Sequence, residues 1–453
     1  MRSPLLALVV LCVGALLDPC PAPAQDATTY ALAQLVERAQ QHSSEVAESQ
    51  WRLEGARAQV AKARAAYLLP RLRLESFGGL VPDAKGDLFH PPDDTLGLRD
   101  LGPFARTELE FVQPLYTFGQ LANLRRAAES GAEVAAARVA EERLDVTLEV
   151  QQYYYGLLLA EDLLDLVRRL RGELEKWQAR IDPDNPDVPL SGPYKLKLAL
   201  IELDKRERQL EDRARLARAA LAWRAGLPEE PPLQLVAGAA LVPEVAAVPP
   251  LDSLYAVALR ERPDWRQLRL GIAAKGALHD AARSAYYPQV FVAGGVRYAV
   301  APGRTDQHNP FVKDDYNYLG GAVVVGLRQS FEWGLLGADV QKARAELYEL
   351  RAKERTAVQG IRLDVRRAWD DFRQVEQCLA AARQARSLGR EWIQVAQDEY
   401  DLDPGQLREL VSAFESYAGL EQEYREAVYE YNLGLARLER AVGLQLGLRP
   451  RGE

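Results

Sequence analysis

The sequence comprises 453 residues, with 57 basic and 65 acidic side chains and a formal net charge of −8. An acidic balance of this kind argues against nucleic acid as a partner. A chain of this length would ordinarily form two or three globular domains. After the N-terminal segment, no apolar run approaches the roughly 18–20 residues that a membrane-spanning helix needs.

Residues 1–24 are typical of a secretory signal peptide. Arg2 supplies a positive charge, Leu5–Leu17 is a short apolar stretch, and Ala22-Pro23-Ala24 forms a small-residue cleavage site. We therefore expect an exported chain whose mature form begins near Gln25. An exported chain without a spanning helix is free in the periplasm, is secreted, or crosses an outer membrane with strands.

Of the three cysteines, only Cys378 follows the predicted signal peptide. The mature chain therefore has no intramolecular disulfide and no cysteine cage for a metal ion. A single thiol in an oxidising compartment is tolerated best in the protein interior, so we expect Cys378 to be buried.

The rest of the chain repeats itself at a period of about 217 residues. Pro70 and Pro288 each separate an alanine-rich helical stretch from an alternating one. Gln113 and Gln329 close the second alternating stretch of each half. The segment LAWRAGL at 221–227 recurs as LERAVGL at 438–444. We therefore expect two repeats of one plan, residues 25–228 and 229–449.

Each half contains two stretches in which polar and apolar residues alternate, within hairpins at about 70–115 and 288–331. Segments of about ten residues with one apolar face are typical of transmembrane β-strands. A soluble four-stranded sheet packed on helices is the alternative. The candidate lipid-facing positions near the mid-plane are Leu74, Leu109, Val292 and Val325.

Long helical stretches are the most unusual feature of the sequence. No proline occurs between Pro114 and Pro183 or between Pro310 and Pro404. Apart from one skipped turn, apolar residues from Leu144 to Ile181 recur at steps of three or four, the pattern of a helix packed along its length. Helices over about 120–181 and 335–402 would reach roughly 90 and 100 Å.

A helical stretch also precedes each hairpin, at Tyr30–Leu69 and Leu251–Tyr287, and a returning helix follows each long one. An isolated coiled coil does not explain why each long helix is joined directly to a strand pair.

Four strands cannot close a barrel by themselves, because about eight are needed. An open sheet edge in hydrocarbon leaves backbone groups unpaired at a cost of several kcal/mol each. If the strands lie in a membrane, the chain must oligomerise. Two copies would give a barrel nearly filled by side chains, whereas three would give twelve strands and a conducting lumen.

Several motifs recur in the order found in one known family. A proline at 70 and 288 ends a helix before a strand, and Gln113–Gly119 (QPLYTFG) places an aromatic residue and a glycine after a strand end. The second copy, Gln329–Gly334, is one residue shorter and lacks the proline. Tyr429-Glu430-Tyr431 begins an amphipathic run that ends at Gly443. Over residues 28–448 the chain resembles the TolC family of outer-membrane efflux and secretion exit channels.

The resemblance implies a mainly α protein with a membrane β-barrel contribution. Four strands per chain would close a twelve-stranded barrel in a homotrimer, continued by a long α-helical barrel. It implies a passive conduit in the outer membrane that extends into the periplasm, as the exit channel of a tripartite efflux or type I secretion system. The implied partners are a periplasmic adaptor protein, an inner-membrane transporter and outer-membrane lipid, with no cofactor.

The family's periplasmic entrance is constricted by acidic rings, and the resemblance places the tips of this chain at about 181–194 and 400–410. Tyr400 falls on the family's tip tyrosine, and Glu409 and Ser412 fall on its two ring positions. Asp401 and Asp403 contribute to the negative field, and Lys195 stands about where the family often has an acidic latch residue. Ordinary solvated helix ends are the alternative for these residues. The first tip, with Asp182, Asp184 and Asp187, is the next place to expect an acidic ring.

The sequence contains no hydrolase, metalloprotease, nucleotide-binding or redox motif, and its four histidines are isolated from one another. We therefore expect no catalytic residue, no metal site and no enzymatic activity. The rival hypothesis is a periplasmic adaptor or scaffold built on coiled-coil hairpins, without a membrane barrel.

Overall fold

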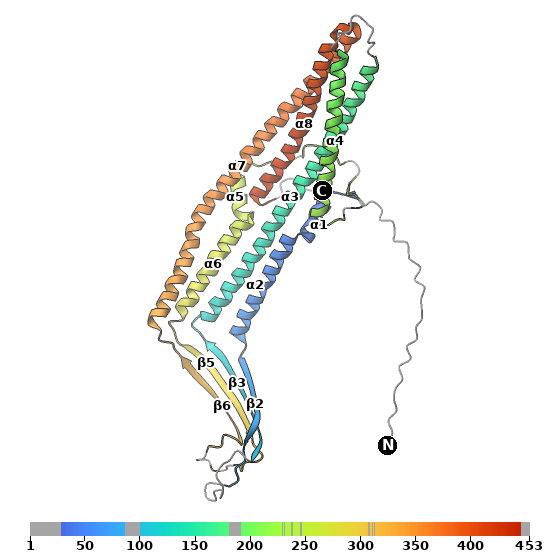
Figure 1. Cartoon of the computed structure of the whole chain (residues 1–453). Coiled ribbons are helices and arrows are strands. Elements are labelled where there is room, and N and C mark those ends of the chain that lie inside the picture. Colours follow the sequence, from blue (N-terminus) through green and yellow to red (C-terminus); the bar gives the residue numbers. More distant parts are fainter. Residues whose placement is uncertain are drawn as a thin grey trace, which may run out of the picture.

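The structure is a computed structural model that describes residues 29–86, 100–180 and 192–444, except residues 229, 231, 237, 238, 245, 246, 307, 308, 310 and 312. The predicted signal peptide and most of the first predicted tip lie outside the described residues. The molecule is elongated, with a strand sheet at one end and helical hairpins at the other (Figure 1).

The first half consists of two helices, two strands and two further helices: α1 (Leu32–His42), α2 (Ser44–Leu68), β2 (Arg71–Pro82), β3 (Leu101–Tyr116), α3 (Gln120–Arg180) and α4 (Gly192–Arg224). The second half has the same order: α5 (Leu251–Glu261), α6 (Pro263–Ser284), β5 (Gln289–Val300), β6 (Tyr318–Arg328), α7 (Trp333–Leu402) and α8 (Leu407–Val442). A short 3-10 helix, η1 (Pro404–Gln406), precedes α8, and β1 (Thr29–Tyr30) pairs in parallel with β4 (Gln234–Leu235).

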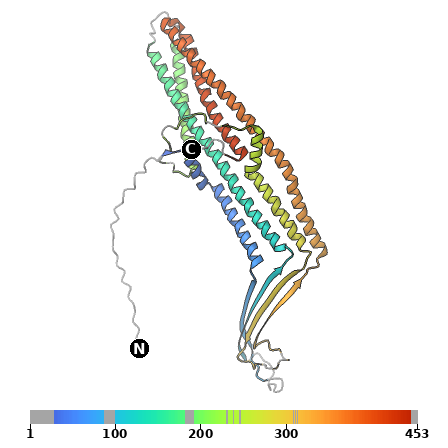
Figure 2. The ribbon, with the colours of Figure 1, turned by 180° about the vertical axis from the view of Figure 1, so that it is seen from behind.

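The sheet runs in the order β2-β3-β5-β6 with every pair antiparallel, so β2 and β6 are its open edges. The pairing of β3 with β5 joins the two halves of the chain. Helices α2, α3, α6 and α7 continue side by side in the order of the strands to which they are connected (Figures 1 and 2). One edge of the molecule is therefore formed by β2 and α2, and the other by β6 and α7.

The long helices are confirmed. Helix α3 has 61 residues and α7 has 70, which at 1.5 Å per residue gives roughly 90 and 105 Å. The predicted seam of α3 is buried from Leu163 to Trp177 against α4 and α8. Because every turn of that seam meets an apolar neighbour, tertiary packing rather than propensity holds so long a helix in register.

The stretches predicted at Tyr30–Leu69 and Leu251–Tyr287 are helical, but each is divided into two helices. Ser43 ends α1 and caps α2, with its hydroxyl accepting a hydrogen bond from the Val46 N–H at 3.2 Å. In the second half Pro263 stands at the first position of α6 and holds Arg262 extended. Side-chain capping and proline's missing N–H each end one helix and begin the next.

Both returning helices end in a left-handed glycine that packs on the break of its own half. Gly226 has φ +65° and Gly443 has φ +80°. A Cβ on Gly226 would lie 2.5 Å from His42 Cγ, and one on Gly443 would lie 2.9 Å from Arg262 Cα. Only glycine combines this backbone angle with so close an approach. The recurrent LxxxxGL segments at 221–227 and 438–444 are therefore the docking points of the two repeats.

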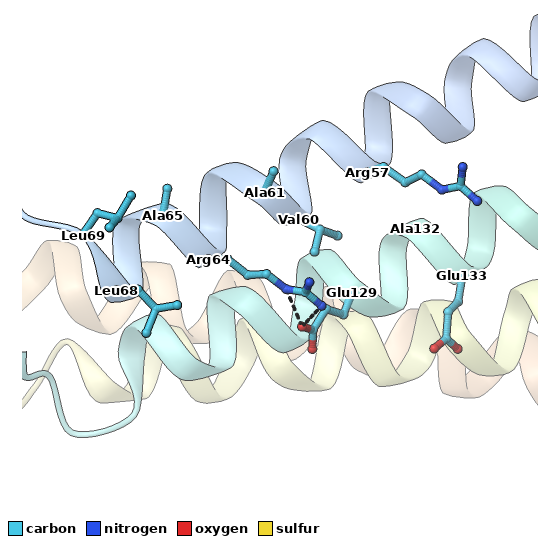
Figure 3. A pocket seen from close by; sticks show the side chains of 10 residues that line it. All are labelled: Arg57, Val60, Ala61, Arg64, Ala65, Leu68, Leu69, Glu129, Ala132 and Glu133. Carbon is cyan, nitrogen blue, oxygen red and sulfur yellow. Dashed lines mark hydrogen bonds and ion pairs between the residues drawn. The ribbon is translucent and has the colours of Figure 1, made fainter.

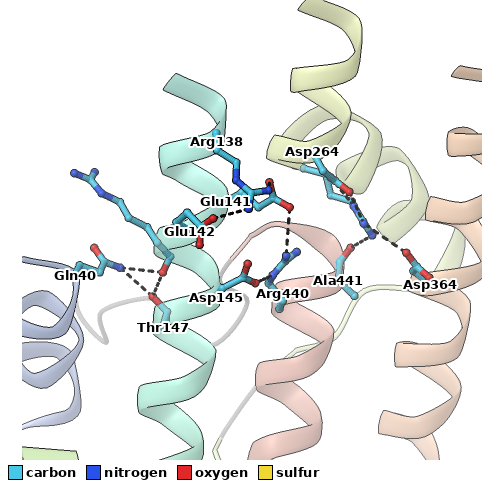
Figure 4. Close-up of polar contacts among 12 residues, drawn as sticks. Gln40, Arg138, Glu141, Glu142, Asp145, Thr147, Asp264, Asp364, Arg440 and Ala441 are labelled. Atoms are coloured by element: carbon cyan, nitrogen blue, oxygen red, sulfur yellow. Dashed lines mark hydrogen bonds and ion pairs between the residues drawn. The ribbon is translucent and has the colours of Figure 1, made fainter. Parts of the chain in front are cut away.

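A buried arginine reinforces each of these docking points. In the first half Arg224, at the end of α4, pairs with Glu149 at 2.7 Å and Glu45 at 3.0 Å. In the second half the arginine lies in the break itself, where Arg262 donates to the Ala441 carbonyl at 3.0 Å and lies 3.5 Å from Asp364 (Figure 4). The two halves thus form the same junction. The buried arginine belongs to the returning helix in the first half and to the break in the second.

The expected burial of Cys378 is wrong, because its side chain is exposed on α7. The buried positions of this part of α7 are Val365, Phe372 and Leu379, which follow one another at steps of seven. Cys378 precedes a seam position by one residue, and one residue corresponds to a rotation of about 100° around a helix. The thiol therefore points away from the core.

Candidate functional site

The register of the sheet separates apolar and polar side chains onto opposite faces. Leu74 lies opposite Leu109, Leu109 opposite Val296, and Val292 opposite Val325. The four predicted lipid-facing positions therefore share one face. Within the described strands this face, called the apolar face below, carries no Asp, Glu, Lys or Arg. Its large side chains include Leu72, Leu74, Leu80, Leu101, Leu109, Phe111, Val290, Val292, Val296, Tyr298, Val300, Leu319, Val323, Val325 and Leu327.

The opposite face, called the polar face below, carries all the charged residues of the four strands. They are Arg71, Arg73, Glu75, Arg106, Glu108, Glu110, Arg297 and Arg328. Glu108 accepts from Arg297 Nε at 2.8 Å and also pairs with Arg106, while Arg73 pairs with Glu75. A sheet with one charge-free face and one ion-paired face suits hydrocarbon on one side and water on the other.

Aromatic side chains gather where the strands meet the helices. The Tyr116 and Phe118 rings are 4.7 Å apart, and Phe118 stacks on Tyr287 at 5.2 Å. Tyr286 and Phe331 are also exposed at this level. Tyrosine rings, which have an apolar body and a polar hydroxyl, are enriched at membrane–water interfaces. The junction between sheet and helices thus has the composition of an interface.

The two copies of the strand-end motif adopt different backbones. In the first, Phe118 has φ +49° and Gly119 has φ +92°, forming a left-handed turn before α3. In the second, which is one residue shorter, Gly334 lies in the first turn of α7. The shorter connection enters its helix directly and has no left-handed glycine. Pro70 and Pro288 stand immediately before β2 and β5, Gln113 lies in β3 and Gln329 follows β6.

At the helical tip, Asp403 and Glu409 occupy different environments. Asp403 is extended between α7 and η1, and its carboxylate accepts from the Gly405 N–H at 2.9 Å. Glu409 is exposed in the first turn of α8. A negative charge there is favoured by the helix dipole. The Asp403 carboxylate is therefore engaged in the turn, whereas that of Glu409 points into solvent.

Tyr400 packs against the apolar cluster of the tip, whose buried members include Trp177, Leu407 and Phe414. Burial raises the pKa of its hydroxyl, and the nearby Asp401 carboxylate raises it further. Tyr400 is therefore protonated at neutral pH and contributes to packing, whereas Asp401 is exposed.

Two of the predicted tip residues, Lys195 and Ser412, line one groove between α4 and α8. The groove has a volume of about 960 Å³, with Leu198, Val411 and Phe414 among its apolar lining residues. Glu409 does not line this groove. The groove is also lined by ionisable residues that the family motifs did not point to. They are Glu202, Arg206, Arg408, Glu415, Glu423 and Glu426.

Comparisons with known proteins agree with this geometry. Residues 35–176 match the family model described as outer membrane efflux protein. The chain carries an outer membrane efflux protein domain. The TolC-like recognition and the outer-membrane localisation predicted from the sequence are thereby confirmed. No curated protein is significantly similar to the chain by sequence.

Solved structures show the same fold over almost the whole chain. The open state of the Neisseria gonorrhoeae MtrE outer membrane channel has a TM-score of 0.73 and 19% identity, covering 93% of this chain and 91% of that chain. The Vibrio cholerae outer membrane protein VceC has a TM-score of 0.70 and 17% identity, covering 92% and 96%. The Campylobacter jejuni CmeC outer membrane channel has a TM-score of 0.69 and 14% identity, covering 95% and 92%.

Within the described residues, no helix is long and apolar enough to span a membrane. The described residues also contain no group of three or more His, Cys, Asp and Glu side chains that could hold a metal ion.

Below the helical tip, a buried ionic cluster joins three helices. Glu421 on α8 is 1% exposed and accepts from Arg386 at 2.8 Å and Arg390 at 2.7 Å, both on α7. Arg425, one turn along α8, pairs with Glu421 and with Asp162 on α3 at 3.0 Å. Burial alone would raise the pKa of Glu421, but the hydrogen bonds from Arg386 and Arg425 lower it to about 2.

We predict that Glu421→Ala lowers the free energy of unfolding by about 3–5 kcal/mol, because it removes the buried carboxylate shared by Arg386, Arg390 and Arg425 and leaves the buried Arg425 with Asp162 alone. Glu430→Ala, at an exposed position of the same helix, should cost less than about 1 kcal/mol. The measurement is denaturant unfolding of the detergent-solubilised protein, followed by helical circular dichroism.

The same pair of proteins gives a pH test. Because the folded-state pKa of Glu421 lies below its ordinary value of 4.5, its contribution is complete above that pH and is lost as pH falls toward 2. The stability difference between wild type and Glu421→Ala should therefore be constant from pH 8 to 5 and shrink below it. A difference that changed between pH 8 and 6 would show that another group governs the cluster.

Proposed function

We propose that the protein is the outer-membrane exit duct of a tripartite efflux or type I secretion system, a passive conduit without catalytic residues. The observation that carries this proposal is the four-stranded sheet with one charge-free face. Four helices packed side by side, α2, α3, α6 and α7, continue from this sheet. Such a sheet places its apolar face in lipid and its polar face on water. The long helices extend the same wall on the order of 100 Å away from the membrane.

Assembly of three copies follows from the open edges of the sheet. Among the described strands, β2 and β6 each pair on one side only, and unpaired backbone groups are not tolerated in hydrocarbon. Pairing β2 of one copy with β6 of the next closes a barrel, and three copies give twelve strands. Helix α2 leads into β2, and α7 follows β6. The same closure therefore brings α2 of one copy beside α7 of the next.

The edges that meet in this assembly expose apolar side chains. A groove of about 900 Å³ runs between α2 and α3, lined by Val60, Ala61, Leu68 and Leu69 (Figure 3). On the other edge, α7 exposes a series of large apolar residues along its length: Leu335, Tyr348, Leu363, Leu388, Val395 and Leu402. We propose that α7 of the neighbouring copy covers the α2/α3 groove.

The helical tips serve in this proposal as gate and docking surface. Three copies of Glu409 around one axis would form the main acidic ring, with Asp401 and Asp403 contributing. The groove between α4 and α8, with Lys195 and Ser412 at its tip end, would receive a periplasmic adaptor protein. That adaptor would join the duct to an energised inner-membrane transporter.

The experiment that tests the function separates it from the rival adaptor or scaffold. We expect the exported protein in the outer-membrane fraction as a detergent-stable homotrimer, measured by native mass spectrometry after membrane fractionation. The expected trimer should also conduct ions in a planar bilayer. Recovery as a soluble monomer after export would contradict the duct and favour the rival.

Two adjacent residues of β6 test which face meets lipid. Val325 lies on the apolar face and Val324 on the polar face, and both side chains are exposed in the single chain. Val325→Arg should destabilise the barrel by about 2–4 kcal/mol, whereas Val324→Arg should have a mild effect. The readout is the urea midpoint of the trimer in detergent or lipid. Equal effects at both positions would contradict the assignment of faces.

The gate is tested by Glu409→Ala in a planar bilayer. Acidic side chains gathered on one axis attract cations, so the wild-type channel should be narrow, cation-selective and blocked by multivalent cations from the periplasmic side. Glu409→Ala should weaken both selectivity and block, and Asp403→Ala should do so less because its carboxylate also holds the turn. Trimer stability should be unaffected.

An unchanged conductance, selectivity and block in Glu409→Ala would place the acidic ring elsewhere. The next variants would then be in the first tip, at Asp182, Asp184 and Asp187, which lie outside the described residues.

A further inference from the structure

The charges of the polar face are not evenly distributed along the strands. All three acidic residues, Glu75, Glu108 and Glu110, lie in two adjacent rows of the register that also contain Arg73 and Arg297, and Arg106 in the next row pairs with Glu108. Glu75 and Glu108 are ion-paired there, and Glu110 lies directly opposite Arg73. The middle of the polar face therefore compensates its own charges.

The rows nearest the helices have a different composition. Arg71 shares its row with Val112, Ala293 and Val324, and Arg328 lies opposite Gln289. The row between them is formed by Pro114, Phe291 and Gly326. Within the described strands, these three rows contain two arginines and no carboxylate.

The guanidinium groups of both arginines are accessible to a ligand. Arg71 and Arg328 are exposed in the single chain, and Arg328 lies over the Phe291 ring at 4.9 Å. A guanidinium held on an aromatic face keeps its N–H groups free for a further acceptor. The neighbouring side chains of these three rows are mostly small or apolar, and none carries a carboxylate; Gln289, opposite Arg328, donates its amide to Gln120.

We propose that Arg71 and Arg328 form a basic collar on the inner wall of the duct, at the level where the strands meet the helices, and that the collar binds the oxyanion groups of anionic cargo. The inference rests on the proposed function, because the polar face becomes the inner wall only when three copies close the barrel. Each copy contributes two guanidinium groups to the collar. Arginine pairs with carboxylate, phosphate and sulfate groups through two parallel hydrogen bonds.

The collar implies that the sign of the charge on the inner wall changes along the conduit, from negative at the tip to positive at the collar. Cargo would leave the acidic tip and reach a zone of opposite sign before the outer mouth. A field of this kind raises the local concentration of anions and weakens as salt rises. Molecules that carry a phosphate, sulfate or carboxylate group would therefore be retained at the collar more than neutral molecules of the same size.

The test is calorimetric titration of the detergent-solubilised trimer with inositol hexakisphosphate, with myo-inositol as the uncharged control. We expect saturable binding of the phosphate compound that weakens as salt is raised, and no binding of myo-inositol. The double variant Arg71→Gln/Arg328→Gln should bind on the order of tenfold more weakly. Arg71→Lys/Arg328→Lys, which keeps the charge, should retain most of the binding.

Two further results separate failure of the collar from failure of the duct. Lys313→Gln, in the described part of the loop between β5 and β6, removes one positive charge outside the collar and should leave the affinity unchanged. If a stable, conducting trimer bound inositol hexakisphosphate equally with and without Arg71 and Arg328, the collar would be wrong and the duct would stand. If no trimer formed, the duct itself would be wrong, and the collar with it.

Discussion

The need to pair every backbone group inside a membrane governs this molecule. A four-stranded sheet has two open edges, and in hydrocarbon each unpaired N–H or C=O costs several kcal/mol. The sequence divides the sheet into a face without charge and a face that carries eight charged residues. A soluble sheet has no need for so complete a separation. The arrangement fits a sheet whose charge-free face contacts lipid and whose charged face contacts water. A neighbouring copy at each edge then pairs the backbone groups of the edge strands.

The duplicated plan of the chain continues the wall of the duct beyond the membrane. Each half supplies two strands, two helices that lead from the sheet, and a hairpin that returns to the middle. The return is fixed by a left-handed glycine and a buried arginine at the break between the first two helices of each half. Farther toward the tip, the cluster around Glu421 joins α3, α7 and α8.

Much of the fold was predictable because its determinants are periodic. Alternation at Leu72 and Leu74 predicts a strand face, and steps of three and four from Leu144 to Ile181 predict a long helix. The breaks at Ser43 and Pro263 were not anticipated, because a capping serine and a proline within an alanine-rich stretch are tolerated in other helices. Exposure of Cys378 depends on a rotation of one residue relative to a seam that only the packed structure defines.

The candidate sites were less predictable for a related reason. Matching motifs placed Glu409, Ser412 and Lys195 at the tip, but only the packing puts Lys195 and Ser412 in one groove and leaves Glu409 outside it. The charge distribution of the polar face likewise emerges only from the register, since Arg71 and Arg328 are far apart in sequence. The buried cluster around Glu421 gave no signal in the sequence, because charged residues on long helices are usually solvated.

The central claim is that β2 of one copy pairs with β6 of the next. It is tested most directly by placing a photo-reactive benzoylphenylalanine at Leu74 of edge strand β2 and mapping the products by mass spectrometry. The account predicts crosslinks from position 74 to residues 318–328 of a second copy, and crosslinked species up to the trimer. The same group at Leu109, in the interior strand β3, should react only within its own chain. Crosslinks from position 74 that were confined to its own chain would contradict the closed duct.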